Sequence, residues 1–246
     1  MPSSPLWDPS VTLKSHDFAG TGKWTTRAPL LALEHPDPAL QLPSDAVLHP
    51  QVFLRNTTAR SVKAQLSIHW RDGQSHGRVR LPEATLAADE TRVVDIRQLQ
   101  ENGTIPSTAY WAQLTLATDT HPNEVMAVAA SFDESLRYGA QTPFSDQLAF
   151  HLEGSAWRVD ATHNSIIAAG NGGSLPVNAR LTFFYGNGSQ AYEVDQTIAA
   201  DDEMLVDVGR LIRDRIPDRN GHVLPGDLNT GAYRLQDLAE TPGASL

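Results

Sequence analysis

The 246-residue sequence contains no cysteine, which excludes disulfide bonds, thiolate catalysis and cysteine-ligated zinc. Basic residues are scarce, because 19 Lys and Arg stand against 29 Asp and Glu, a net charge of -10. Such a field repels polyanions, and no basic run with interleaved aromatic residues opposes it. Nucleic acid is therefore not an expected partner. No apolar run approaches the roughly 18 residues that a membrane-spanning helix needs, so no membrane span is expected.

Catalytic and cofactor motifs are also missing. The sequence has no G-x-S-x-G, H-E-x-x-H or Walker A motif. None of the nine histidines lies two to four residues from another, so no local pair of metal ligands is present. The first ten residues lack the charged and apolar regions of a secretory signal. We therefore expect no enzyme activity, no catalytic or metal-binding residue and no cofactor.

What the sequence does contain is a pair of internal similarities. TLAADETRVVDIRQL at 85–99 resembles TIAADDEMLVDVGRL at 197–211, 112 positions later. VKAQLSIHWRDG at 62–73 resembles VNARLTFFYGNG at 177–188, 115 positions later. A three-residue difference in spacing is expected where a surface loop changes length. The two pairs predict that the chain contains one structural unit twice.

The second similarity predicts a strand in each copy, because apolar and polar residues alternate with a period of two. Asp72 and Gly73, like Asn187 and Gly188, then predict hairpin turns. The residues expected to face a core are Val62, Ala64, Leu66, Ile68 and Trp70 in one copy, and Val177, Ala179, Leu181, Phe183 and Tyr185 in the other.

The first similarity predicts a short strand followed by a short helix. Asp95 and Asp207 are expected to cap these helices, and Gln98 lies at capping-box distance from Asp95. A further shared strand is predicted by aligning the dipeptides at 109–110 and 232–233, both Ala-Tyr.

These patterns predict an all-β fold of two tandem immunoglobulin-like antiparallel β-sandwiches, each with a short helical insertion. The first sandwich is expected over residues 48–153 and the second over 154–246. Residues 1–47 contain seven prolines and are predicted to form a lead-in with one or two strands, at 11–15 and 29–33.

The predicted second sandwich is one strand short. VMAVAASF at 125–132 predicts an apolar strand in the first sandwich, and at the matching point of the second the sequence reads TPGASL and stops. A missing strand leaves backbone groups and an apolar face uncovered. Three explanations stay open: a longer protein, a lead-in that folds back, or a strand donated by another chain.

Three aromatic residues are candidates for ligand binding: Tyr110, Trp111 and Trp157. Flat rings stack on sugar faces, although tryptophan in a sandwich more often fills the core. Asn56, Asn102 and Asn187 stand in N-x-[ST] sequons. The glycine-rich stretch at 170–174 and the Asp218 segment are predicted to be turns, the latter an Asx turn in preference to a calcium loop.

Four segments resemble a family of uncharacterised bacterial proteins built from tandem immunoglobulin-like sandwiches. They are RYGAQTPFSDQLAFH at 137–151, PDRNGHVLP at 217–225, FLRNTTARSVKAQLSIHW at 53–70 and HNSIIAAGNGG at 163–173. The resemblance covers roughly residues 48–240 and implies an extracellular or cell-surface setting. It implies no activity, cofactor or site residue, and members of the family continue past the point where this chain ends.

The leading hypothesis is a non-catalytic structural or protein-interaction module of a bacterial envelope or extracellular protein, with self-association or a protein partner acting through strand addition. The alternative is a carbohydrate-binding β-sandwich that uses Tyr110, Trp111 and Trp157. A hydrolase whose carboxylates or histidines converge only in space is a third hypothesis.

Overall fold

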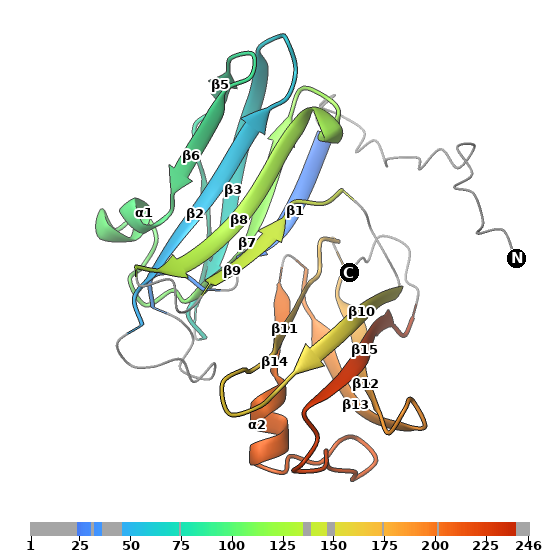
Figure 1. Ribbon diagram of the computed structural model, residues 1–246. Coiled ribbons are helices and arrows are strands. Elements are labelled where there is room, and N and C mark those ends of the chain that lie inside the picture. The colour runs from blue at the N-terminus through green and yellow to red at the C-terminus, as the bar shows by residue number, and fades with distance from the viewer. Residues whose placement is uncertain are drawn as a thin grey trace, which may run out of the picture.

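The computed structural model describes residues 24–30, 32–35, 46–73, 75–134, 139–146, 151–173, 175–200 and 202–239. The strand predicted at 11–15 and the sequence TPGASL lie outside these residues. Every strand pair is antiparallel, so the prediction of an all-β fold is confirmed (Figure 1).

Two sheets face each other in the first sheet pair, which comprises β1–β9 (Figure 1). One has the order β1-β7-β3-β4, with β5 also paired to β3, and the other has the order β6-β2-β8-β9. The buried apolar cluster between them draws residues from both sheets. The bounds are β1 Trp24–Leu30, β2 Leu48–Asn56, β3 Val62–Arg71, β4 His76–Arg80, β5 Ala84–Leu86, β6 Thr91–Asp95, helix α1 Arg97–Glu101, β7 Trp111–Thr118, the 3-10 helix η2 Pro122–Glu124, β8 Val125–Asp133 and β9 Gly139–Pro143.

The second sheet pair comprises β10–β15 and has its own buried cluster. One sheet has the order β10-β15-β12-β13, whereas the other contains two strands in the described residues, β11 and β14. The bounds are β10 His151–Arg158, β11 Ile166–Gly170, β12 Val177–Tyr185, β13 Gln190–Ile198, β14 Glu203–Asp207, helix α2 Val208–Arg213 and β15 Thr230–Asp237.

The alternating pattern places its apolar residues as predicted. In β12, the side chains of Val177, Ala179, Leu181 and Phe183 are fully buried, and Tyr185 is half-buried at the strand end. In β3, the four predicted inward residues from 62 to 68 are likewise buried, and Trp70 is half-buried. The hairpin prediction at Asn187 and Gly188 is confirmed by their positive φ angles of 57° and 80°.

Residues at matching positions in the two copies also lie opposite matching partners in the neighbouring strand. Val62 lies opposite Leu86, and Val177 lies opposite Ile198. Both members of each pair come from the similar stretches of the sequence. The strands that carry the two similarities therefore have the same neighbours and the same register within their own sheet pairs.

One helix cap is as predicted and the other is not. Asp207 caps α2, where its side chain accepts a hydrogen bond from the Arg210 backbone N–H. Asp95 was expected to do the same for α1, but the N-cap of that helix is Ile96, without a side-chain cap. The Asp95 carboxylate instead accepts from the Arg97 N–H, two residues on, which forms an Asx turn.

The lead-in contributes a strand earlier than expected. β1 spans Trp24–Leu30, not 29–33, and pairs along its length with β7, so this segment belongs to the first sheet pair. β10 begins at His151, ahead of the boundary expected at 154, and it pairs with β15 as β1 pairs with β7.

The alignment of the two Ala-Tyr dipeptides is wrong. Leu114 in β7 lies opposite Ile68, and Tyr233 in β15 lies opposite Phe183. Because Ile68 and Phe183 are matching positions, Tyr233 corresponds to Leu114. Tyr110 precedes β7 altogether.

Candidate functional site

The candidate site is the outer edge of β11 together with the apolar face that it borders. In the first sheet pair, β2 is a central strand, with β6 on one edge and β8 on the other. β11 is its counterpart, because β11 pairs with β14 as β2 pairs with β6. In the described part of the chain no strand pairs with the other edge of β11, although β1 comes close to β11. An open edge exposes backbone donors and acceptors to another strand.

The apolar face beside this edge is marked by Leu152. In the first sheet pair, Leu116 lies opposite Thr26, and in the second, Leu235 lies opposite Leu152. Thr26 and Leu152 therefore occupy matching positions on the inner face of the outermost strand. Thr26 is 9% exposed, whereas Leu152 is 43% exposed despite being the more apolar residue.

Thr26 and Leu152 differ in exposure because they differ in the strands that cover them. β8 and β9 approach β1 in the first sheet pair, and Figure 1 shows both strands extending that layer beyond β2. The second sheet pair has no counterpart of these two strands among its described residues. Tyr233 shows the same effect: it is partly exposed, whereas Leu114 at the matching position is fully buried. Leu152 and Tyr233 thus line one apolar surface that no described strand covers, here called the strand slot.

Two of the three predicted ligand-binding residues lie inside the protein. Trp157 is 1% exposed and packs edge-on against Phe183, with ring centroids 6.2 Å apart. Trp111 is 5% exposed, and the Arg71 guanidinium carbon lies 5.7 Å from its ring centroid. Tyr110 is half-buried, and its hydroxyl lies close to Gly73. The structure does not bring the three rings to one exposed surface, so a stacked sugar finds no platform made by them.

The sequence marks Asn56 as part of a sequon, but it did not predict the structural role of this residue. This side chain is fully buried, and its Nδ2 donates to three backbone carbonyls: Arg60 at 2.7 Å, Leu86 at 3.3 Å and Ala87 at 2.8 Å. The amide therefore ties the loop after β2 to the turn that follows β5. A side chain held in this way is not available for glycosylation.

Asn171 has the same role in the second sheet pair, within the glycine-rich stretch predicted to be a turn. It is fully buried, and its Nδ2 donates to the carbonyls of Leu175, Ile198 and Ala199 at 2.8, 3.1 and 3.0 Å. The signal available in the sequence was that Asn56 and Asn171 lie 115 positions apart, the spacing of the strands that follow them.

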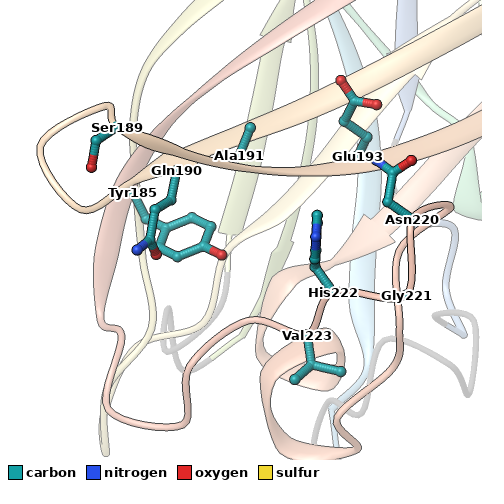
Figure 2. Close-up of a pocket in the computed structure, with 9 residues that line it drawn as sticks. All are labelled: Tyr185, Ser189, Gln190, Ala191, Glu193, Asn220, Gly221, His222 and Val223. Carbon is teal, nitrogen blue, oxygen red and sulfur yellow. The ribbon is translucent and has the colours of Figure 1, made fainter.

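A shallow open hollow lies between the β12–β13 hairpin and the loop at 220–223 (Figure 2). The loop is organised by Asp218, whose side chain is buried and accepts hydrogen bonds from the backbone N–H groups of Asn220, His222 and Glu193. Burial acts to raise the pKa of Asp218, but these hydrogen bonds and the nearby His222 outweigh it and hold the pKa below its usual value. The expected Asx turn is confirmed, and Asp218 is fully used as a structural acceptor.

A charged contact joins the two sheet pairs. The Nη1 of Arg71, at the end of β3, donates to both carboxylate oxygens of Asp202 at 2.8 Å. The adjacent Glu203 is 4% exposed. Its burial raises its pKa well above the ordinary value, the Asp202 carboxylate adds to this effect, and Arg71 opposes it. Asp202 and the adjacent Glu203 are therefore part of the junction between the sheet pairs.

None of the helices in the described part of the chain has the length and the apolar character needed to cross a membrane. The described residues also include no group of three or more His, Asp or Glu side chains placed to hold a metal ion.

Comparison with known proteins identifies no family. No family model matches the sequence, and no curated protein matches it. Among solved structures, the chain is similar to a crystal structure described as Thermotoga maritima 1070, at 12% identity and a TM-score of 0.34. That match covers 49% of this chain and 92% of the other. A TM-score this low supports neither a shared fold nor a shared function.

Proposed function

We propose that the chain consists of two immunoglobulin-like β-sandwiches in tandem and acts as a non-catalytic interaction module. Its partner is an extended segment that adds to the edge of β11 and fills the strand slot. The tandem arrangement is supported by the matching registers of Val62 with Leu86 and of Val177 with Ile198. It is also supported by the matching hydrogen bonds of Asn56 and Asn171.

The observation that carries the proposal is the contrast between Leu152 and Thr26. Apolar side chains on the inner face of a sandwich strand are normally buried, because removing apolar surface from water is the main driving force for packing two sheets. An inner-face leucine that is 43% exposed, beside an open strand edge, matches the surface that β8 and β9 cover in the first sheet pair.

Three acidic side chains support a non-catalytic role, because they are engaged in structural contacts. Asp207 caps a helix, Asp218 organises a loop, and Asp202 pairs with Arg71. A bacterial envelope or extracellular setting belongs to the same proposal and is supported by the resemblance described above. An interaction module in that setting would hold or display other proteins.

Amide hydrogen exchange on the full chain tests whether the edge is available. In an antiparallel strand, alternate residues direct their N–H groups to opposite neighbours. The N–H groups facing the open edge are expected to exchange fast and those facing β14 slowly. Their counterparts in β2, which face β8, are expected to exchange slowly. The fast set is Ile166 and Ala168, and the slow matched set is Gln51 and Phe53.

Equal protection of these two sets would overturn the proposal, because it would mean that the chain itself already covers the edge of β11. Fast exchange at Ile167 and Ala169 as well would show that β11 is not held as a strand, which also contradicts the proposal.

A further inference from the structure

We infer that the strand slot is specific for an antiparallel strand that carries small apolar side chains at alternate positions, as β8 does. This inference rests on the proposed strand addition and names the chemistry of the partner. The occupant is a segment of another protein with this pattern, whereas a second copy of the chain is an outcome that the test distinguishes.

The direction and register follow from β2 and β8. These strands run antiparallel, with Ala129 opposite Val52 and Ala127 opposite Leu54. Val52 and Leu54 correspond to Ile167 and Ala169, because the pairs Val52–Val94 and Ile167–Val206 match in the ladders with β6 and β14. An incoming strand in the same register places its small residues opposite Ile167 and Ala169.

The backbone of β11 is arranged to receive such a strand. Asn171 donates its N–H to the Asp202 carbonyl, and the Ser165 carbonyl accepts from Val208, so odd-numbered residues direct their backbone groups toward β14. The even-numbered residues alternate with them and face the open edge. β2 follows the same rule, since Asn56 donates to the Glu90 carbonyl on the β6 side.

The size limit comes from the opposite wall of the slot. In the first sheet pair, the inner face of β8 carries small side chains. These are Val125, Ala127 and Ala129, which are 6%, 8% and 1% exposed. Ala127 and Ala129 belong to the same buried cluster as Leu114, and β8 also approaches β1, the strand that carries Thr26. In the second sheet pair, the matching wall residues are larger, Leu152 and Tyr233. A bulkier wall leaves less room, so the incoming side chains must be as small as those of β8 or smaller.

The slot also selects for apolar side chains. Leu152 and Tyr233 present hydrocarbon and ring surface to the incoming strand, and the β11 residues bordering it are Ile167 and Ala169. A charged side chain placed against this surface would lose water without gaining a partner.

The test is a binding titration on the full chain with labelled synthetic peptides, followed by fluorescence anisotropy. The first peptide copies β8, VMAVAASFD, with two lysines at each end for solubility. The second has leucine at both inward alanine positions, VMLVLASFD, and the third is a scrambled sequence with the same lysines. We expect saturable binding of the first peptide, at least about tenfold weaker binding of the second, and no saturation with the third.

Variants of the chain locate the binding. Ala168→Pro removes an edge-facing N–H and leaves the β14 ladder intact, and proline is tolerated at strand edges. We expect it to abolish binding with little change in the thermal midpoint. Leu152→Glu gives a second route if Ala168→Pro fails to fold, since it places a charge in the slot. Tyr233→Leu introduces the smaller residue that the first sheet pair has at the matching position. It is expected to recover part of the binding of VMLVLASFD.

Equal affinity for the β8 peptide and its leucine variant would overturn the inferred preference for small side chains, but it would not contradict strand addition. Absence of saturable binding by the β8 peptide, with fast exchange at Ile166 and Ala168, would overturn the inference alone. A dimer of the chain by itself in sedimentation velocity, lost on Ala168→Pro, would assign the edge to a second copy and also overturn it.

Discussion

Asn56 and Asn171 make the same buried hydrogen bonds, 115 residues apart. Each amide donates to a carbonyl four residues later in its own loop and to two consecutive carbonyls at the turn that precedes the next strand. Each also accepts a backbone N–H two residues on. A buried amide with these partners fixes the distance between a strand and a turn distant in sequence.

Replacing either asparagine with alanine is expected to destabilise the protein by about 2–4 kcal/mol, because buried carbonyls lose their donor. Urea unfolding measures the loss for Asn56→Ala and Asn171→Ala. Asn102→Ala is the matched control, since the Asn102 side chain is exposed and serves a local turn, and we expect a change within about 0.5 kcal/mol. Similar stability of all three variants would contradict a structural role for the buried amides.

The strand faces were predictable from the sequence because a period of two requires only local information. Leu66 and Leu181 illustrate this, since both lie where the alternation places them. The register of the last shared strand was not predictable from the Ala-Tyr dipeptides. Register depends on which residue lies opposite Ile68 or Phe183 in another strand. Two identical residues in the sequence do not reveal that partner.

The candidate site was predictable only in outline. The sequence indicated that the second unit lacks a strand, but not which surface is left uncovered. The exposure of Leu152 depends on its position opposite Leu235, across a sheet that joins segments more than 80 residues apart. The burial of Trp111 depends on tertiary packing in the same way, which is why a stacking role remained open from sequence alone.

Gly231→Ala is expected to destabilise the second sheet pair. A Cβ at this position would lie 2.5 Å from the Phe184 carbonyl oxygen and 2.9 Å from the Trp157 ring. The carbonyl belongs to a paired strand and cannot shift cheaply, so we expect a loss of about 1–3 kcal/mol in urea unfolding. Gly226→Ala is the control, because nothing lies within 4 Å of its added Cβ. Equal midpoints for the two variants would show that Trp157 is not packed against Gly231.

Gly170→Ala tests the junction between the sheet pairs. Its added Cβ would lie 2.7 Å from the Oε1 of Gln113, a β7 side chain that is 2% exposed. We expect a destabilisation of about 1–2 kcal/mol, relieved when Gln113→Ala is combined with it. Urea unfolding of both single variants and the double variant gives the coupling. Strict additivity would contradict contact between the two residues, and Gly139→Ala, whose added Cβ makes only ordinary contacts, is the control.

Glu203→Gln is expected to change how stability depends on pH. Burial raises the pKa of Glu203 well above its ordinary value of 4.5, so the folded protein retains a proton that the unfolded chain releases. Stability from this group is complete below pH 4.5 and is lost as the pH rises through the folded-state pKa. Glutamine cannot ionise. The melting temperature of Glu203→Gln, measured relative to that of the native chain, should therefore rise as the pH increases from 4.5. Glu101→Gln is the matched control, because the Glu101 side chain is exposed and lies outside the junction. Parallel curves for Glu203→Gln and the native chain would mean that the Glu203 carboxyl is ionised at little cost in the folded protein.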